Sequence, residues 1–320
     1  MKRTGVILAA AVFLFAVAVC PVAAADDKPN ILFIFADDMA YEMVGAYGLT
    51  DVTTPHLDRL AADGMTFTHT YNMGSWSGAV CLASRAMLNT GRFLWKAKRL
   101  KVGAEAKAGR FWSEQMKKAG YETYFTGKWH VKANPAEVFD HAAHVRGGMP
   151  RQTKTRYDRQ FEKDKPDTWS PYDPKFGGFW AGGKHWSEVV ADDAEKFLAG
   201  AAKSDKPFFM YLAFNAVHDP RQSPKEFVDR YPLSRIKLPE NYLPMYRPKH
   251  HMKSTYDKQE VKAVGRMLGA MGSPPRLRDE RLAPFPRSKH AVLVNRQEYY
   301  AITEHMDTQI GRILAALAKT

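Results

Sequence analysis

Residues 30–38 read Asn-Ile-Leu-Phe-Ile-Phe-Ala-Asp-Asp, an apolar run that ends in two carboxylates. An uninterrupted apolar run of this length is typical of a central strand covered on both faces. Asp37 and Asp38 follow at the carboxyl end of that strand, which is the edge where ligands gather in open α/β sheets. The stretch therefore predicts an α/β protein with a site at one edge of its sheet.

The rest of the chain alternates further expected strands with expected helices. Strands are expected over 65–71, 121–126 and 207–214, and helices over 55–63, 84–90, 111–119, 186–202 and 295–319. Thr54 is expected to cap the first of these helices with its hydroxyl, and Gly64 to end it. Residues 219–294 are rich in Pro, Arg and Lys and predict a loop-rich excursion. This alternation predicts a layered α/β/α sandwich with a mostly parallel central sheet.

The first 25 residues have the pattern of a secretory signal. Lys2 and Arg3 precede an apolar run of 14 residues, Val6 to Val19, and alanines at 23–25 supply a small-residue cleavage site. Fourteen residues are too few to span a bilayer comfortably, so removal is expected rather than anchoring. We therefore expect a signal peptide over 1–25, one domain over 26–320, no later membrane span, and export to the periplasm or the extracellular space.

The formal net charge of +13 restricts the classes of partner. An exported protein this basic suits nucleic acid, acidic lipid or an anionic polysaccharide, and charge alone does not choose among them. The export signal and the lack of a recognisable nucleic-acid-binding motif argue against nucleic acid.

Residues 81–92 read Cys-Leu-Ala-Ser-Arg-Ala-Met-Leu-Asn-Thr-Gly-Arg, and Cys81 is the one cysteine outside the expected signal. Without a disulfide partner it is either a buried thiol or a chemically special one. The stretch resembles the signature of the type I sulfatases, Cys-x-Pro/Ala-Ser-Arg followed by Leu-x-Thr-Gly-Arg. A helix with a buried cysteine is the plainer alternative.

This resemblance implies that Cys81 is oxidised to formylglycine by a maturation enzyme. The hydrated aldehyde would then attack the sulfate ester with one hydroxyl and release sulfate through the second. Arg85, one helical turn further on, would reach back to hold the diol.

Two further motifs extend the resemblance. Lys128 and His130 match the Gly-Lys-x-His motif of the family, and two-residue spacing on an extended segment would point both the same way. The resemblance gives Lys128 to sulfate binding and His130 to orientation or proton transfer at the diol. His218 resembles the histidine of the Pro-His-x-Pro segment, with Val217 where that pattern has Pro. It implies protonation of the leaving alcohol or sulfate binding by His218.

The resemblance also implies a divalent metal, usually calcium, held by Asp37, Asp38 and the residue derived from Cys81. A capped strand end is the alternative reading of the paired aspartates. In the family, the helix matching 295–319 is followed by a strand, an Asp-His or Asp-Asn pair that completes the metal site, and a further Lys. Residues 1–320 contain none of these, so we expect an N-terminal portion of an alkaline-phosphatase-like fold, its C-terminal part missing, with weak calcium binding and little turnover.

The function that these residues predict is hydrolysis of a sulfuric ester, on a sulfated sugar, a polysaccharide or another organic sulfate. A phosphonate or phosphodiester hydrolase of the same fold is one alternative. An inactive protein that binds polyanions through its basic surface is another, supported by the net charge and the absent ligands.

Overall fold

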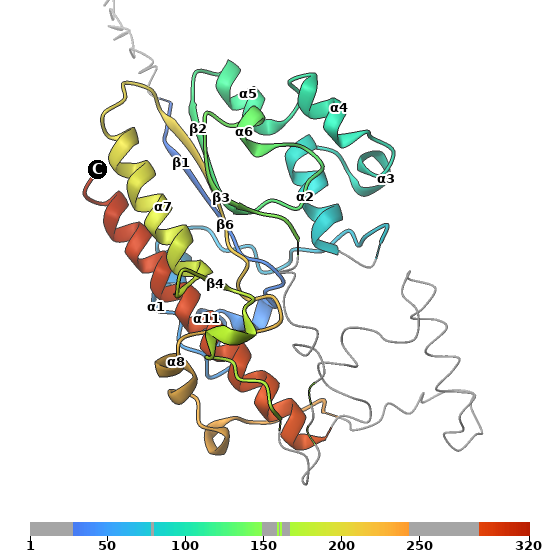
Figure 1. Ribbon diagram of the computed structural model, residues 1–320, viewed down its shortest axis with the longest axis vertical. Helices are drawn as coiled ribbons and strands as arrows, with labels where there is room; N and C mark the ends of the chain where they lie inside the picture. Colours follow the sequence, from blue (N-terminus) through green and yellow to red (C-terminus); the bar gives the residue numbers. More distant parts are fainter. Residues whose placement is uncertain (1–27, 78–79, 149–158, 160, 162–166, 243–287) are drawn as a thin grey trace, which may run out of the picture.

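Four segments form one parallel sheet in the computed structural model, which describes residues 28–77, 80–148, 159, 161, 167–242 and 288–320. The strands are β1 (Ile31–Phe35), β2 (Glu122–Lys128), β3 (His141–Arg146) and β6 (Phe208–Ala213), in the order β1-β6-β2-β3 (Figure 1). Every pairing among them is parallel, so the predicted parallel sheet is confirmed. The expected signal segment and residues 243–287 of the expected excursion lie outside the described residues.

The first strand was expected at the centre of the sheet, and the structure places it at one edge of the described sheet. β6 lies inside instead, paired with β1 on one side and β2 on the other, and all of its residues are buried. The residues of β1 are only partly buried because nothing pairs with its second side among the described residues. An apolar run therefore identified a strand but not its position in the sheet.

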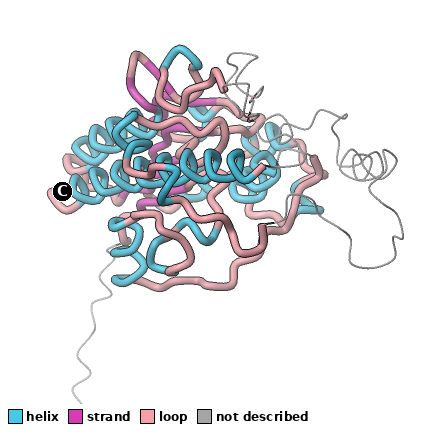
Figure 2. Tube along the Cα trace, turned by 90° about the horizontal axis from the view of Figure 1, so that it is seen from below, coloured by secondary structure: helices cyan, strands magenta, loops and turns pink. Residues whose placement is uncertain are grey.

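Helices cover both faces of the sheet, which confirms the α/β/α layering. α7 (Trp186–Ala201) and α11 (Lys289–Leu317) lie on one face and contact each other along their length (Figures 1 and 2). The other face carries α2 (Val80–Thr90), α3 (Leu94–Ala97), α4 (Val102–Lys107), α5 (Trp112–Lys118) and α6 (Pro135–Val138).

The side chains of β6 alternate between two apolar cores, one on each face. Met210 and Leu212 belong to the core that includes Ile302 and Met306 of α11. Phe209 and Tyr211 face the other helices, where the ring of Trp112 meets them edge-on at centroid distances of 4.8 and 5.4 Å. Burial of these side chains on both faces holds the inner strand in place.

Shorter elements complete the described chain. They are η1 (Tyr41–Met43), η2 (Gly45–Tyr47), α1 (Pro55–Asp63), η4 (Pro174–Phe176), the two-residue strands β4 (Trp180–Ala181) and β5 (Lys184–His185), α8 (Lys225–Asp229) and η5 (Leu233–Arg235).

Two sequence-based expectations for helices need correction. α11 begins at Lys289 rather than at 295, because the Ser288 side chain accepts a hydrogen bond from the backbone of Ala291 and caps the helix there. Thr54 does not cap α1. Its hydroxyl accepts from Gly45 N at 2.7 Å and donates to Asp58 at 2.8 Å, so it joins η2 to α1. α1 does end at Asp63, before Gly64, as expected.

The strand expected over 65–71 is wrong: the structure describes no strand there. Met65, Phe67 and Tyr71 are exposed, so the alternation of apolar side chains has no buried face to match.

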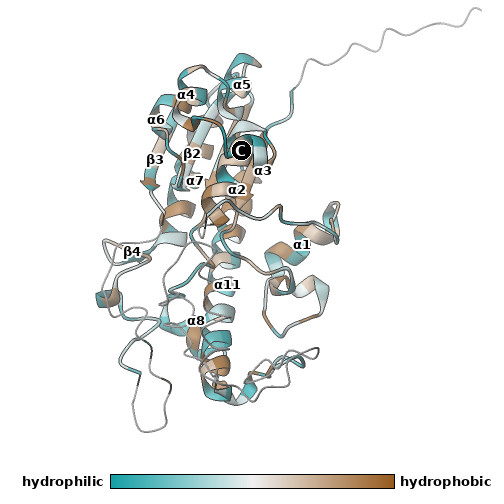
Figure 3. Ribbon diagram, turned by 90° about the vertical axis from the view of Figure 1, so that its right-hand side faces the viewer, coloured by the Kyte–Doolittle hydropathy of each residue, from teal (hydrophilic) through white to brown (hydrophobic). Residues whose placement is uncertain are grey.

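Hydropathy colouring shows hydrophilic and hydrophobic turns mixed along α11 (Figure 3). Within the described segments, no helix has both the length and the apolar character that crossing a membrane requires.

Candidate active site

The carboxyl ends of the parallel strands lie at one edge of the sheet, and three segments with reactive side chains meet there. Asp37 and Asp38 follow β1, Lys128 ends β2, and residues 215–219 follow β6. Backbone hydrogen bonds of 2.9 Å join Asp37 N to Ala216 O and Val217 N to Asp37 O. These bonds hold the segments after β1 and β6 together, so the site is built on paired backbone rather than on a loose loop.

A buried group of charges forms the floor of the site. The guanidinium of Arg85 donates to Lys128 O at 2.5 Å, to the Tyr211 hydroxyl at 3.2 Å and to Asp37 Oδ1 at 3.2 Å. The Lys128 ammonium pairs with the other carboxylate oxygen of Asp37. Arg85 and Lys128 are fully buried, and Arg85 also lies over the ring of Phe35. Two buried cations therefore share one carboxylate.

Burial disfavours the charged form of Asp37, but the attraction of Lys128 and Arg85 outweighs it, so the pKa of this carboxyl lies below its usual value. Asp37 is thus ionised near neutral pH. One carboxylate cannot neutralise two cations, so the floor keeps a net positive charge.

Gly127 allows Lys128 to reach Asp37. Its φ of +96° lies in the left-handed region, and a Cβ on it would lie 2.0 Å from Ala213 O of β6. Only glycine fits this approach of β2 to β6. The register with β3 also shifts between Thr126 and Gly127, which redirects the end of β2.

Cys81 lies in the first turn of α2, and its Sγ is 3.2 Å from Nδ1 of His130. His130 has φ +52°, so the backbone turns there instead of continuing extended. Lys128 and His130 were expected to point the same way, and the turn sends Lys128 to Asp37 and His130 to Cys81. Gly148 packs against the imidazole, since a Cβ there would lie 2.7 Å from its Nε2.

The pKa of His130 is lowered by burial first, and further by the nearby charges of Lys128 and Arg85. The ring is therefore neutral at neutral pH and can accept a proton from a group on residue 81. Arg85 was expected to reach back to Cys81. Its side-chain hydrogen bonds to described residues go to Asp37, Lys128 and Tyr211, and none goes to Cys81.

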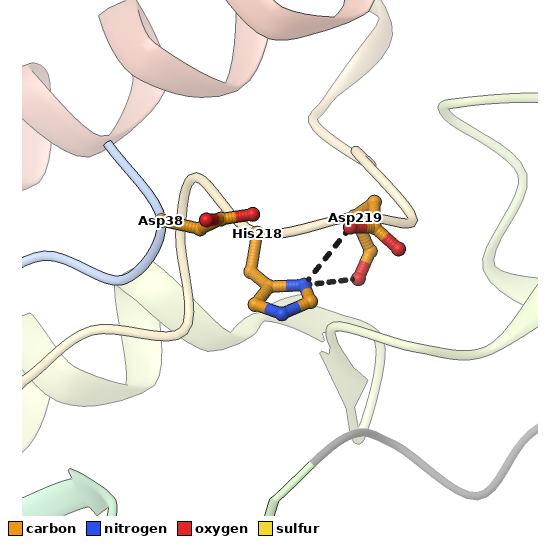
Figure 4. Close-up of side chains that lie close together, drawn as sticks. All are labelled: Asp38, His218 and Asp219. Carbon is orange, nitrogen blue, oxygen red and sulfur yellow. Dashed lines mark hydrogen bonds and ion pairs between the residues drawn. The ribbon is translucent and has the colours of Figure 1, made fainter. Parts of the chain in front are cut away.

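Asp38, His218 and Asp219 form a second group beside the floor (Figure 4). His218 Nδ1 lies 2.8 Å from the backbone oxygen of Asp219 and 3.2 Å from its carboxylate. Asp38 has φ +60° and is exposed, and its backbone oxygen accepts from the Tyr299 hydroxyl at 3.0 Å. Sequence reasoning did not select Asp219, although a carboxylate directly after a strand-end histidine was a usable signal.

These residues fit a divalent cation only in part. Ligand atoms of Asp38, His218 and Asp219 lie within 4.8 Å of one another. The two carboxylates suit a hard cation such as calcium, whereas an imidazole suits softer metals. Asp37, expected to be a ligand with Asp38, has both oxygens paired with cations. The expected ligands therefore do not lie together: Asp37 belongs to the buried group with Arg85 and Lys128, and Asp38 to the group with His218 and Asp219. Cys81, the third expected ligand, contacts His130.

Comparison with known proteins assigns the family. A model of the sulfatase family matches residues 29–320. The chain belongs to the sulfatase family. It is 27% identical over 327 residues to an arylsulfatase of Klebsiella aerogenes, covering 93% of this chain and 64% of that relative. It is 34% identical over 140 residues to an N-acetylgalactosamine-6-O-sulfatase of Bacteroides thetaiotaomicron, covering 42% of this chain and 26% of that one.

A solved structure with the same fold is a phosphonate monoester hydrolase from Silicibacter pomeroyi, with TM-score 0.55 and 18% identity, covering 91% of this chain and 60% of that one. At this identity the likeness supports the alkaline-phosphatase-like fold alone. This sulfatase-family chain spans under two thirds of the length of the relatives named here.

Proposed function

We propose that this chain supplies the nucleophile and anion-binding side of a sulfuric ester hydrolase. The observation that carries the proposal is the contact of Cys81 Sγ with His130 Nδ1 at 3.2 Å, beside the buried cations Arg85 and Lys128. A sulfate ester carries one negative charge, and the net positive floor attracts it. Membership of the sulfatase family supports the same reaction.

Residue 81 is assigned as the nucleophile after oxidation to formylglycine by a maturation enzyme. The hydrated aldehyde offers two hydroxyls, one to attack sulfur as the bond to the alcohol breaks, and one to lose its proton as sulfate leaves and the aldehyde returns. His130 is placed to take the proton from residue 81, because its Nδ1 faces that residue and its ring is neutral near pH 7.

Lys128 and Arg85 are assigned to the sulfate oxygens. Both side chains are anchored by Asp37, so their positive charge is fixed in place before the substrate arrives. His218 is assigned to protonation of the leaving alcohol. A backbone carbonyl can only accept a hydrogen bond, so the contact with Asp219 O places a proton on Nδ1 and orients the ring, and the proton for the alcohol would come from Nε2 of the protonated ring.

Calcium would be held by Asp38 and Asp219, with Asp37 joining if it exchanged a cation partner. When bound, the ion would polarise the sulfate oxygens.

The class of substrate follows the relatives: one is named for the sulfate of N-acetylgalactosamine, so a sulfated sugar is the substrate we propose. The pattern of residues 1–25, a basic start followed by an apolar run and small residues, supports export before the protein acts.

The test combines mass spectrometry with two substitutions at one position. The peptide that carries residue 81 should contain the aldehyde when the protein is made in a host that matures sulfatases. Cys81→Ala should then release no sulfate from an aryl sulfate. Cys81→Ser keeps one hydroxyl and lacks the second, so it should release at most one equivalent of alcohol and then stop.

Repeated turnover by Cys81→Ser would show the covalent scheme to be wrong. An aryl phosphonate measured in parallel separates the two ester classes, because the proposal expects the sulfate to be cleaved faster. A converted protein that binds sulfated polysaccharide and cleaves neither ester would instead support the polyanion-binding alternative.

A further inference from the structure

A cavity of about 650 Å³ is lined in part by His130, the residue whose ring contacts Cys81. It lies between α2 and the α3–α4 segment, which are neighbours in Figure 1. Leu82 and Ala86 of α2, together with Trp76, supply part of its apolar wall. Pockets of this size accommodate small organic ligands such as a sugar unit.

The cavity reaches the neighbours of the proposed nucleophile. His130 is one of its lining residues, and the same ring contacts Cys81 at 3.2 Å. Leu82 of its wall is the next residue after Cys81 on α2. A substrate group that occupies the cavity would therefore lie against His130, close to the reacting ester.

Four lysines surround the cavity: Lys98, Lys101, Lys107 and Lys132. All four are exposed, and no described carboxylate forms an ion pair with any of them. The segment 92–110 has seven Lys or Arg residues and a single acid, Glu105, which pairs with Arg110. The charge around the cavity is therefore positive and not neutralised by the described part of the protein.

The backbone brings these lysines together from two separate segments. A Cβ on Gly103 of α4 would lie 2.9 Å from the backbone oxygen of Lys132. The absent side chain lets α4 approach the segment after His130 closely. Lys107 of α4 and Lys132 therefore line one cavity.

We propose that this cavity binds a second sulfate group, carried by the sugar unit next to the one whose ester is cleaved. The inference rests on the proposed function and narrows the substrate to sugar chains with more than one sulfate. Lysine ammonium groups on flexible stems suit a tetrahedral anion whose position varies between sugars. Trp76 and Leu82 offer apolar surface for the face of a sugar ring.

The test measures equilibrium binding to the full chain, without turnover, using the Cys81→Ala variant to prevent hydrolysis. The probes are a disulfated disaccharide, the same disaccharide with one sulfate, and an unsulfated uronic acid disaccharide that carries only carboxylate. The double substitution Lys101→Gln with Lys132→Gln should weaken binding of the disulfated probe roughly tenfold and the monosulfated probe less than about twofold.

The matched control is Lys203→Gln with Lys206→Gln. These lysines are also exposed but follow α7 at the opposite end of the sheet, before β6 begins. The control should leave the binding of all three probes unchanged. Raising the salt concentration should remove most of the difference between the disulfated and monosulfated probes, because exposed charges are screened.

An equal loss of affinity for the disulfated probe in the cavity variant and in the control variant would overturn the proposal. Binding would then depend on the overall charge of the protein rather than on the lysines of the cavity. Equally tight binding of the carboxylate probe would overturn the assignment to sulfate. Hydrolysis of an aryl sulfate by the unsubstituted, converted protein is measured separately. If hydrolysis occurs and the lysine variants bind normally, only this inference fails; if the lysine effect appears without hydrolysis, only the proposed function fails.

Discussion

Lys128 and Lys101 carry the same charge on the same side chain, and they lie in opposite environments on one side of the molecule. Lys128 is fully buried and paired with Asp37, in a group that also contains Arg85. Lys101 is exposed at the rim of the cavity, with no carboxylate paired to it among the described residues. The difference separates two settings of positive charge: the buried cations are held in fixed positions by Asp37 before a substrate arrives, whereas the exposed cations are held by no described carboxylate and can adjust to an anion.

The strongest test of this comparison removes the charge that holds the buried cations. Asp37→Asn would leave Arg85 and Lys128 buried without a counter-charge, so we expect a loss of about 3–5 kcal/mol in the free energy of unfolding. Asp63→Asn breaks only an exposed pair with Arg59 and should cost less than about 1 kcal/mol. Urea unfolding of both variants measures this difference, and similar costs would contradict the structural role of the buried group.

A smaller effect is expected from Arg85→Lys, which keeps the charge but removes the planar fork. Arg85 contacts Asp37, Lys128 O and the Tyr211 hydroxyl together, and a single ammonium cannot reach all three. We expect a loss of about 2 kcal/mol in the free energy of unfolding. Arg99→Lys, at an exposed position, is the control and should change little. Equal stability of the Arg85→Lys variant and the parent protein would show that charge alone holds the floor.

His185 is a buried side chain that carries no charge, and it makes the stability of the fold depend on pH. Burial, with a smaller contribution from His305, holds the pKa of His185 well below its usual value. His185 is therefore neutral in the fold, while the unfolded chain takes up a proton as the pH falls through about 6.5. Its contribution to stability is present above that pH and is lost below it, by up to about 1.4 kcal/mol per pH unit.

Unfolding free energies measured between pH 5 and pH 8 check the sign of this effect. His185→Gln should flatten the acid side of the curve, because Gln does not titrate. His69→Gln, at an exposed position, should leave the slope as it is. A His185→Gln curve parallel to that of the parent would assign the acid sensitivity to other groups.

The smallest effect on stability is expected at the cavity rim. Lys107→Gln removes an exposed and unpaired charge, so the free energy of unfolding should change by less than about 0.5 kcal/mol. Thermal unfolding at equal salt measures this directly. A large loss would mean that the rim lysines support the fold, and the contrast with Lys128 would disappear.

Local sequence pattern predicted the strands β1, β2 and β6 and the longer helices, but it missed β3, β4 and β5 and did not show how the strands pair. The apolar runs at 30–35 and 207–214 and the helix at 186–202 were found within one or two residues of their observed bounds. The place of β1 at the edge depends on which strand lies beside it, and no local pattern contains that information. Alternation over 65–71 failed for the same reason: without a neighbouring strand, Met65 and Phe67 remain exposed.

The site was predictable as a set of residues and less so as an arrangement. Placing Asp37 and Lys128 at strand ends made their meeting plausible, since carboxyl ends share one edge of a parallel sheet. Their direct pairing, and the separation of Asp37 from Asp38, depend on the left-handed backbone at Asp38 and at Gly127. Asp219 was missed because it becomes a candidate metal ligand only through its closeness to Asp38 in space. The two residues are 181 positions apart in the chain.

The pairing of β1 with β6 has a consequence for the time course of synthesis. β1 ends at Phe35 and its partner strand ends at Ala213, so the ribosome makes about 180 further residues before the two can pair. At typical elongation rates of about 5–20 residues per second, β1 waits roughly 10–35 s for its neighbour. Throughout that interval its apolar side chains and open backbone groups are accessible to chaperones or to other chains, and Asp37 has no partner loop to hold it.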